Sequence, residues 1–224
     1  MYKHFVKRLI DLILSSVAII ILALPMLAIA IAIKIDDPGP VLFKQKRVGK
    51  KKNGEITYFM IWKFRSMKMS TPHDTPTHLL ENPDQYITRV GRFIRKTSLD
   101  ELPQIYQVFT SKLSVIGPRP ALWSQDDLVS EREKYGANDI KPGITGWAQI
   151  NGRDELEIDV KAKFDGEYAA ALNAGKFKGL AMDIKCFFGT IKSVLRHDGV
   201  VEGGTGEMKR KEEEKNVEQE VATK

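Results

Sequence analysis

Two adjacent carboxylates, Asp100 and Glu101, are the clearest candidates for chemistry in the sequence. They stand in the stretch 95–104, Arg-Lys-Thr-Ser-Leu-Asp-Glu-Leu-Pro-Gln, so cations and hydroxyls come just before them. An isolated Asp-Glu pair is usually structural, and Ser98 with Glu101 matches the S-x-x-E capping box. Pro103 disfavours that register because its ring would clash inside the helix, whereas Asp100 as the N-cap brings Pro103 into the first turn. This second register predicts Asp100 at the positive end of a helix dipole, where phosphate also binds.

Several basic residues stand in backbone that we expect to be stiff or extended. Arg119 lies between two prolines in the segment 117–120, and Arg153 follows a predicted turn. Lys63 and Arg65 alternate along a predicted strand, and the period of two places them on one face. Each cation alone is typical of a solvated surface. Guanidinium groups bind phosphate oxygens through paired hydrogen bonds, so these cations with a carboxylate pair indicate a site for a pyrophosphate and a divalent metal.

The element that precedes these residues is a long apolar run over residues 9–33, whose one charge is Asp11. A helix needs about 20 such residues to cross a bilayer. A cleaved signal peptide would have a shorter apolar stretch of about 7–15 residues and a small-residue cleavage site. The run therefore predicts a membrane element that the protein retains.

Basic residues flank this run on both sides, three within positions 1–8 and seven between positions 34 and 52. An excess of lysine and arginine marks the cytoplasmic flank of a membrane segment. Pro25 lies past the middle of the run and should kink the helix. A re-entrant helix–break–helix that enters and leaves by one face satisfies both flanks. The alternative is a single-span anchor whose more basic second flank dominates, and both place the rest of the chain in the cytoplasm.

The remainder of the chain predicts an α+β fold with a small β-hairpin and mostly helices. We expect strands over 41–48 and 56–64, joined by the glycine- and lysine-rich turn between them. Helical spacing is present over 87–94 and 99–109, and a polar helix follows over about 124–135.

Residues 180–195 predict an amphipathic helix with Phe and Ile along one side and Lys and Arg elsewhere. This composition suits a membrane interface. Periodicity alone favours an ordinary helix whose apolar side faces the core. From residue 203 onward the chain is rich in Gly, Lys and Glu, which predicts a disordered charged tail.

The charge of the chain is unevenly distributed and excludes a uniformly basic nucleic-acid-coating protein. The formal net charge of the 224 residues is +6. Residues 1–68, which include the membrane element, hold 13 basic and 4 acidic side chains and so carry +9 by themselves. The three tryptophans are dispersed, which also disfavours nucleic-acid binding. The single cysteine, Cys186, excludes an intramolecular disulfide framework and a multi-cysteine zinc site.

Several long motifs occur in a fixed order, and together they resemble the bacterial sugar transferases, the small monotopic phosphoglycosyl transferases. After the basic N-terminus and the proline-broken apolar run, the motifs are KFRSM at 63–67, TSLDELPQ at 97–104, SVIGPRP at 114–120 and KPGITGWAQINGR at 141–153. The resemblance covers about residues 1–202. It implies a re-entrant anchor over 1–36 and a mostly helical cytoplasmic catalytic domain with interfacial helices over 37–202. The tail over 203–224, predicted from composition, lies outside it.

The resemblance also implies a reaction. Such enzymes move a sugar-1-phosphate from a UDP-sugar to undecaprenyl phosphate and release UMP with Mg²⁺, as the first membrane step of glycoconjugate assembly. Asp100 matches the nucleophile that forms a covalent aspartyl-phosphosugar intermediate and also approaches the metal. Glu101 matches the second member of the dyad and would assist with the metal or a proton. N-acetylated sugars, bacillosamine-type sugars and galactose are all compatible.

The family pattern assigns further residues by position. The matching basic residues at the phosphate site are Lys63, Arg95, Arg119 and Arg153, and Asp165 matches an acidic residue further along. The family has a Ser-Pro pair at its helix break, whereas this chain has Leu24-Pro25 and so keeps only the proline.

The implied partners are a UDP-sugar, undecaprenyl phosphate and the cytoplasmic leaflet of a bacterial inner membrane, and no nucleic acid. A membrane-anchored scaffold whose cations bind anionic headgroups is the alternative class.

Overall fold

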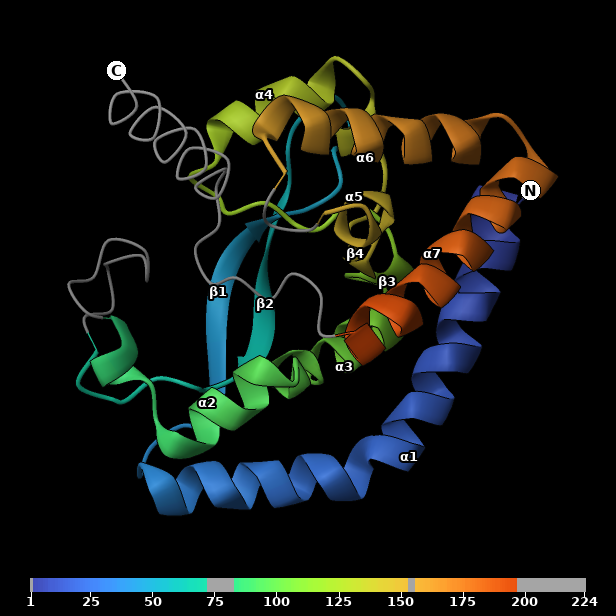
Figure 1. Ribbon diagram of the computed structural model, residues 1–224. Coiled ribbons are helices and arrows are strands. Elements are labelled where there is room, and N and C mark those ends of the chain that lie inside the picture. The colour runs from blue at the N-terminus through green and yellow to red at the C-terminus, as the bar shows by residue number, and fades with distance from the viewer. Residues whose placement is uncertain (1, 72–82, 153–155, 197–224) are drawn as a thin grey trace, which may run out of the picture.

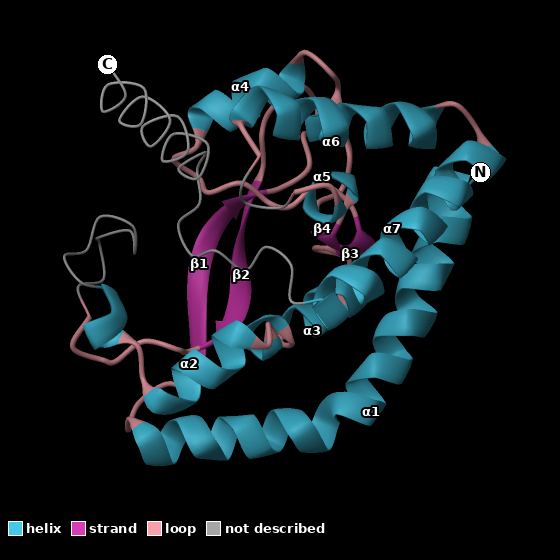
Figure 2. Ribbon diagram, in the orientation of Figure 1, coloured by secondary structure: helices cyan, strands magenta, loops and turns pink. Residues whose placement is uncertain are grey.

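A computed structural model of the chain describes residues 2–71, 83–152 and 156–196. These residues form an α+β fold in which helices surround one antiparallel hairpin and one short parallel strand pair (Figures 1 and 2). The α-helices are α1 (Lys7–Asp36), α2 (Arg89–Lys96), α3 (Gln104–Phe109), α4 (Asp126–Glu133), α5 (Trp147–Ile150), α6 (Ile158–Asn173) and α7 (Lys176–Arg196). The strands are β1 (Leu42–Val48), β2 (Tyr58–Phe64), β3 (Ser114–Ile116) and β4 (Gly143–Thr145). The predicted tail, 203–224, lies outside the described residues.

Helix α1 bends between two nearly straight halves (Figure 1), and it contains Pro25. The helix runs continuously through the proline, so the predicted break is a bend in one helix. Both halves dock on the rest of the molecule. In the first half, Asp11 binds β3, and in the second half Met26 and Ile33 pack with Phe64 of β2 and Ile94 of α2. Length and composition make α1 the one helix among the described residues that could cross a membrane.

The predicted β-hairpin is confirmed. Strands β1 and β2 pair antiparallel, from Leu42 opposite Phe64 to Val48 opposite Tyr58. The hairpin stands upright in Figure 1, with α2 and the second half of α1 beyond its lower end. The C-terminal end of β2 therefore places Lys63 next to the turn that carries Asp100.

The sequence did not predict the parallel pair of β3 and β4, because both strands are only three residues long. The segment of β3 is stiff and proline-rich, and that of β4 is typical of a turn. Ser114 pairs with Gly143 and Ile116 pairs with Thr145. The start of β4 and the residue after β3 approach so closely that a Cβ atom on Gly143 would lie 2.1 Å from the Gly117 nitrogen. Only glycine fits this approach, which brings the 117–120 segment next to the 146–150 segment.

The helix predicted over 99–109 is shorter than expected. A 3₁₀ turn covers Leu99–Glu101, and α3 begins only at Gln104. The buried residues of α3 are Gln104, Gln107 and Val108, while Tyr106 and Phe109 of the predicted apolar face are 40% and 46% exposed. Helix α6 was not predicted at all, whereas α2 and α4 match the predicted helices closely.

The apolar side of α7 is exposed, so the expectation that this side faces a core is wrong. Phe187, Phe188 and Ile191 are 39%, 64% and 43% exposed, and Cys186 on the other side is fully buried. The outer face of the first half of α1 is also apolar and exposed, with Ile20 at 76%, and Figure 2 shows α7 starting close to the N-terminal end of α1.

A buried carboxylate joins the N-terminal segment to the last two helices. Asp183 of α7 accepts hydrogen bonds from the Tyr2 hydroxyl at 2.5 Å, from Lys7 Nζ at 2.8 Å and from the Tyr168 hydroxyl at 2.7 Å. Tyr168 belongs to α6 and is 1% exposed. This network fixes the start of α1 against α6 and α7.

Candidate active site

The two candidate carboxylates lie on the 3₁₀ turn Leu99–Glu101, not on a helix N-terminus. Ser98 enters the turn in the left-handed region, with φ of 56°, and its side chain makes no capping hydrogen bond. Pro103 stands at the N-cap of α3, three residues after Asp100. Both predicted registers are therefore wrong, because Pro103 has no N–H to continue a helix from the preceding turn and instead starts a new one. The turn displays Asp100 and Glu101 as neighbours with different surroundings.

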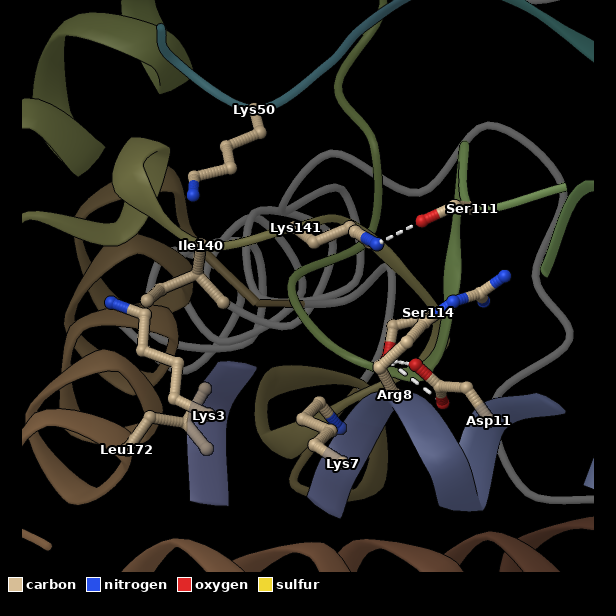
Figure 3. Close-up of a pocket in the computed structure, with 10 residues that line it drawn as sticks. All are labelled: Lys3, Lys7, Arg8, Asp11, Lys50, Ser111, Ser114, Ile140, Lys141 and Leu172. Atoms are coloured by element: carbon tan, nitrogen blue, oxygen red, sulfur yellow. Dashed lines mark hydrogen bonds between the residues drawn. The ribbon is translucent and has the colours of Figure 1, made fainter. Parts of the chain in front are cut away.

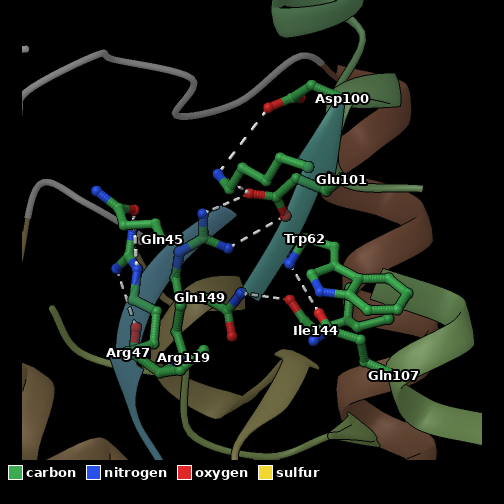
Figure 4. Close-up of polar contacts among 11 residues, drawn as sticks. Gln45, Arg47, Trp62, Asp100, Glu101, Gln107, Arg119, Ile144 and Gln149 are labelled. Carbon is green, nitrogen blue, oxygen red and sulfur yellow. Dashed lines mark hydrogen bonds and ion pairs between the residues drawn. The ribbon is translucent and has the colours of Figure 1, made fainter. Parts of the chain in front are cut away.

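Glu101 is the centre of a compact ion cluster (Figure 4). Its Oε1 accepts a hydrogen bond from Lys63 Nζ at 2.9 Å and one from Arg119 Nη2 at 2.6 Å, and its Oε2 lies 3.3 Å from Arg119 Nη1. The side chain of Glu101 is 13% exposed. The hairpin, the 3₁₀ turn Leu99–Glu101 and the segment after β3 thus meet at one carboxylate.

Asp100 faces the same cations from a greater distance. Its Oδ2 lies 3.9 Å from Lys63 Nζ, and among the described residues no hydrogen bond to its side chain occurs. Burial raises the pKa of Asp100 to about 6, and the positive charge of Lys63 limits the rise. A carboxylate whose oxygens accept no hydrogen bond from the described residues is available for chemistry.

The pKa of Glu101 moves in the opposite direction. Burial alone would raise it, but the charges and hydrogen bonds of Arg119 and Lys63 hold it well below its usual range. The two adjacent carboxylates therefore differ in the pH at which they gain a proton. Glu101 stays ionised as a counter-charge to Lys63 and Arg119, whereas Asp100, with a pKa of about 6, is ionised at neutral pH and protonated in mild acid. Enzymes separate the roles of paired carboxylates by such differences in environment.

Asp165 lies behind this cluster, in a buried ion pair with Arg132. Arg132 Nε and Nη2 lie 2.8 Å and 2.5 Å from Asp165 Oδ2, and Asp165 is 1% exposed. Arg132 Nη2 also donates a hydrogen bond to the Arg119 carbonyl at 2.9 Å. Asp165 thus supports Arg119 through Arg132, and the structure does not bring its carboxylate beside Asp100.

The segment around Arg119 is held from its other side as well. Arg47 of β1 donates a hydrogen bond from Nη1 to the Pro120 carbonyl at 3.1 Å (Figure 4). Two guanidinium groups therefore bind consecutive carbonyls, those of Arg119 and Pro120. The prolines on either side of Arg119 add stiffness, so its side chain reaches Glu101 from a fixed backbone.

The other predicted cations have different positions. Arg95 is in the last turn of α2, close enough for its charge to lower the pKa of Asp100. Arg65 lies beyond β2 and donates to Asp37 and to the Pro40 carbonyl, so it anchors the turn after α1 rather than sharing a face with Lys63 at the site. Arg153 lies outside the described residues.

Gln107 is a positioning residue that the sequence did not reveal. Its Oε1 accepts from the Trp62 N–H at 2.9 Å, and its Nε2 donates to the Met60 carbonyl at 2.7 Å (Figure 4). The amide thereby pairs with the free edge of β2 as a neighbouring strand would. The one sign of this role is the burial of Gln107 on a helix face that mixes polar and apolar residues, because a buried amide needs hydrogen-bond partners.

A pocket opens beside Glu101 toward α7, with a volume of about 170 Å³. Its walls are largely apolar and include Leu102, Ile105, Ile144 and Ile150. Thr190 of α7 closes one side and forms a hydrogen bond of 2.7 Å with Thr145 of β4. The pocket therefore joins the charged turn to the helix whose outer face is apolar and exposed.

The donor set fits Mg²⁺ of the kind that a substrate helps to bind. Among the described residues no group of three or more His, Cys, Asp or Glu side chains is arranged around a metal position. Mg²⁺ is commonly held by one or two carboxylates together with substrate phosphates. Asp100, which is partly buried and not paired with a guanidinium in the described contacts, can serve as such a ligand.

Comparisons with known proteins agree with the motifs. The family profile described as bacterial sugar transferase matches residues 2–197. The UDP-glucose:undecaprenyl-phosphate glucose-1-phosphate transferase of Escherichia coli K12 is 39% identical over 179 residues, which are 74% of this chain and 36% of that protein. The undecaprenyl-phosphate galactose phosphotransferase of Salmonella typhimurium is 35% identical, covering 88% of this chain and 42% of that protein.

A third relative carries another sugar in its name. The UDP-N-acetylgalactosamine-undecaprenyl-phosphate N-acetylgalactosaminephosphotransferase of Aeromonas hydrophila is 35% identical over 85% of this chain and 44% of its own length. The chain thus spans about two fifths of the length of these curated relatives. With the family profile matching nearly all described residues, the chain belongs to the bacterial sugar transferase family.

Proposed function

We propose that the protein is a phosphoglycosyl transferase that moves a sugar-1-phosphate from a UDP-sugar to undecaprenyl phosphate and releases UMP. The observation that carries the proposal is the different surroundings of the two adjacent carboxylates. Glu101 accepts hydrogen bonds from Lys63 and Arg119, whereas Asp100 lies 3.9 Å from Lys63 without a close hydrogen bond from it. The names of the relatives support the donor and acceptor classes.

Asp100 is the nucleophile in this proposal. One of its carboxylate oxygens attacks the phosphorus that bears the sugar, and the bond from that phosphorus to the bridging oxygen breaks, so UMP leaves with the electron pair. An oxygen of undecaprenyl phosphate then attacks the same phosphorus and displaces the Asp100 carboxylate. Atoms and charges balance in both steps without a separate oxidant or reductant. The two half-reactions follow the logic of covalent catalysis.

The cations at the turn supply the electrostatics of these steps. Lys63, Arg95 and Arg119 lie near the carboxylates and would bind the phosphate oxygens of the nucleotide sugar. Arg153 would bind the phosphates, as the family pattern suggests. Asp165, which that pattern also places among the substrate-binding residues, would instead act as a positioning residue that supports Arg119 through Arg132. Mg²⁺ bound at Asp100 and the substrate phosphates would neutralise charge that develops on the leaving phosphate.

The acceptor reaches Asp100 from the membrane side. The pocket between Glu101 and α7 offers apolar walls to the first isoprene units of undecaprenyl phosphate. The exposed apolar residues of α1 and α7, including Leu24 at 75% and Phe188 at 64%, would lie in the bilayer. We infer a re-entrant α1 with Pro25 at its bend and the site in the cytoplasm, because basic residues flank both ends of the helix and both halves dock on the domain.

The direct test is release of UMP by the purified full chain. The protein in detergent is incubated with undecaprenyl phosphate, Mg²⁺ and each of UDP-glucose, UDP-galactose and UDP-N-acetylgalactosamine, and UMP is measured. We expect release with one or more of these sugars, and release that also requires Mg²⁺. Asp100→Asn is the matched control, because it keeps the size of the side chain and removes its charge. Absence of UMP with a wider panel of UDP-sugars contradicts the proposal and favours a membrane-anchored scaffold.

A further inference from the structure

A second cavity, of about 260 Å³, lies where the start of α1 meets the loop after β1 and the segment before β4 (Figure 3). Five basic side chains from these separate parts of the chain line it, together with one carboxylate, two serine hydroxyls and two apolar side chains. The basic residues are Lys3, Lys7, Arg8, Lys50 and Lys141. None of them belongs to the turn of Asp100 and Glu101, so the cavity is separate from the candidate active site.

The one carboxylate of the cavity is already engaged. Asp11 Oδ1 accepts the Val115 N–H at 2.9 Å, and its Oδ2 accepts the Ser114 hydroxyl at 2.8 Å (Figure 3). Asp11 is 3% exposed. It holds α1 against β3 and leaves most of the surrounding positive charge without a counter-ion inside the cavity.

Four of the five cations, Lys3, Arg8, Lys50 and Lys141, have no carboxylate partner among the described residues. Lys3 Nζ donates to the Asn173 side chain at 2.8 Å, and Lys141 Nζ donates to the Ser111 hydroxyl at 2.7 Å. Lys50 points into the cavity in Figure 3 and takes part in no ion pair within the described part of the chain. Arg8 donates to the carbonyls of Val108 and Phe109, and Lys7 is paired with Asp183.

The positive charges in the cavity also repel one another, and this repulsion disfavours the charged form of each lysine. The pKa of Lys141 is lowered by burial and then by the charges of Arg8, Lys50 and Lys7. The pKa of Lys3 is lowered by burial and then by the charge of Lys50. A bound anion would reverse this repulsion, because it would give each ammonium group an opposite charge at short range.

The cavity borders the exposed apolar surface. Phe5 and Leu9, on the same helical segment as Lys7 and Arg8, are 68% and 48% exposed. Phe109, whose carbonyl binds Arg8, is 46% exposed. A group that combines a phosphate with an apolar tail can therefore place the first in the cavity and the second along this surface.

We propose that this cavity is a second anion site, which binds a phosphate-bearing group through Lys3, Lys50 and Lys141. Two sources carry this chemistry, the headgroup of an anionic phospholipid and soluble phosphate. The hydroxyls of Ser111 and Ser114 add neutral polar atoms at the rim and floor. Neither source depends on the transferase reaction, so this site stands or falls independently of the proposed function.

The test compares the full chain with the double variant Lys50→Gln/Lys141→Gln. Lys52→Gln is the matched control, because Lys52 lies in the same turn as Lys50, is exposed and does not line the cavity. Thermal unfolding is followed in detergent with inorganic pyrophosphate, and in nanodiscs of phosphatidylcholine with or without phosphatidylglycerol. Without an anion, the double variant should unfold at the same temperature as the wild type or a higher one, since repulsion is removed. With the anion, the wild type and Lys52→Gln should be stabilised, and the double variant should bind about tenfold more weakly per lysine removed.

The two arms distinguish the sources. Stabilisation by phosphatidylglycerol alone that the double variant loses assigns a lipid headgroup to the cavity. Stabilisation by pyrophosphate in detergent that the double variant loses assigns soluble phosphate, and the part that the double variant keeps belongs to the candidate active site. If the double variant gains as much from either anion as the wild type does, the cavity is not an anion site. Lys50→Glu provides a second readout, because an internal carboxylate should raise the unfolding temperature without anion and abolish the response to it.

Discussion

Arg119 binds Glu101 and leaves Asp100 beside it unbound. The two terminal nitrogens of Arg119 lie 2.6 Å and 3.3 Å from the two Glu101 oxygens, whereas the nearest cation to Asp100 in the described ion pairs is Lys63 at 3.9 Å. Neighbouring carboxylates on one 3₁₀ turn thus receive unequal shares of the same positive charge. Glu101 organises the cations, and the Asp100 oxygens accept no hydrogen bond from the described residues, as the proposed attack on phosphorus requires.

The rate of the first half-reaction should depend on pH through Asp100. Only the ionised carboxylate is a nucleophile, and the pKa of Asp100 is about 6 because burial raises it. Below this pH the group is protonated, so the burst of UMP without acceptor should fall about tenfold per pH unit. Burst kinetics between pH 4.5 and pH 8, roughly two units around the pKa, measure this. A flat profile contradicts the assignment.

Glu101→Gln should move that midpoint to lower pH. The negative charge of Glu101 raises the pKa of Asp100, and its removal also frees Lys63 to approach Asp100. The burst should survive at a lower rate, because Arg119 loses the partner that aims it. Burst kinetics against pH provide the check, with Lys52→Gln as a control far from the turn. An unchanged or raised midpoint would show that Glu101 does not act on Asp100 in this way.

Asp165→Asn should destabilise the fold by about 3–5 kcal/mol, because it leaves the guanidinium of Arg132 buried without a charge partner. Arg132→Met/Asp165→Leu should recover much of that stability, since it removes both buried charges together. The double variant still lacks the hydrogen bond from Arg132 to the Arg119 carbonyl. Its UMP burst should therefore stay slow while its free energy of unfolding returns toward the wild-type value. Wild-type stability in Asp165→Asn would contradict the account.

The sequence predicted the hairpin and the grouping of the charged motifs because their signals are local. β-branched and aromatic residues mark β2, and Lys63, Asp100, Glu101 and Arg119 stand in recognisable motifs that the structure brings together. The exact form of the turn Leu99–Glu101 was not predictable from capping rules. Ser98 adopts a left-handed conformation there and Pro103 starts α3, and both depend on packing around the turn.

Features that join distant segments carry no local signal. Arg132 and Asp165 are 33 positions apart, and Gln107 binds strand residues 45 and 47 positions away. Helix α6 contains Gly166 where a Cβ atom would lie 2.4 Å from the Cβ of Tyr135, so a helix-weakening residue is required by packing. The exposed apolar side of α7 has the same periodicity as a core-facing side, and only the tertiary structure tells them apart.

The re-entrant arrangement that we propose for α1 predicts that both ends of the chain lie on one side of the membrane. A single cysteine placed before Tyr2 and another placed after Lys224, in a Cys186→Ser background, should both resist labelling by a reagent that cannot cross the inner membrane. Cys186 is fully buried, so its replacement removes background without exposing a new thiol. Labelling of the N-terminal cysteine alone would establish a helix that spans the bilayer.

The central claim is that Asp100 forms a covalent bond to the phosphosugar. The full chain is mixed with its UDP-sugar and Mg²⁺ without undecaprenyl phosphate, quenched in acid and digested, and the peptide that contains 97–104 is analysed by mass spectrometry. The account predicts one equivalent of UMP and a sugar-phosphate adduct on Asp100, absent in Asp100→Asn and discharged when undecaprenyl phosphate is added. An adduct that persists in Asp100→Asn, or UMP release that always requires the acceptor, would contradict it.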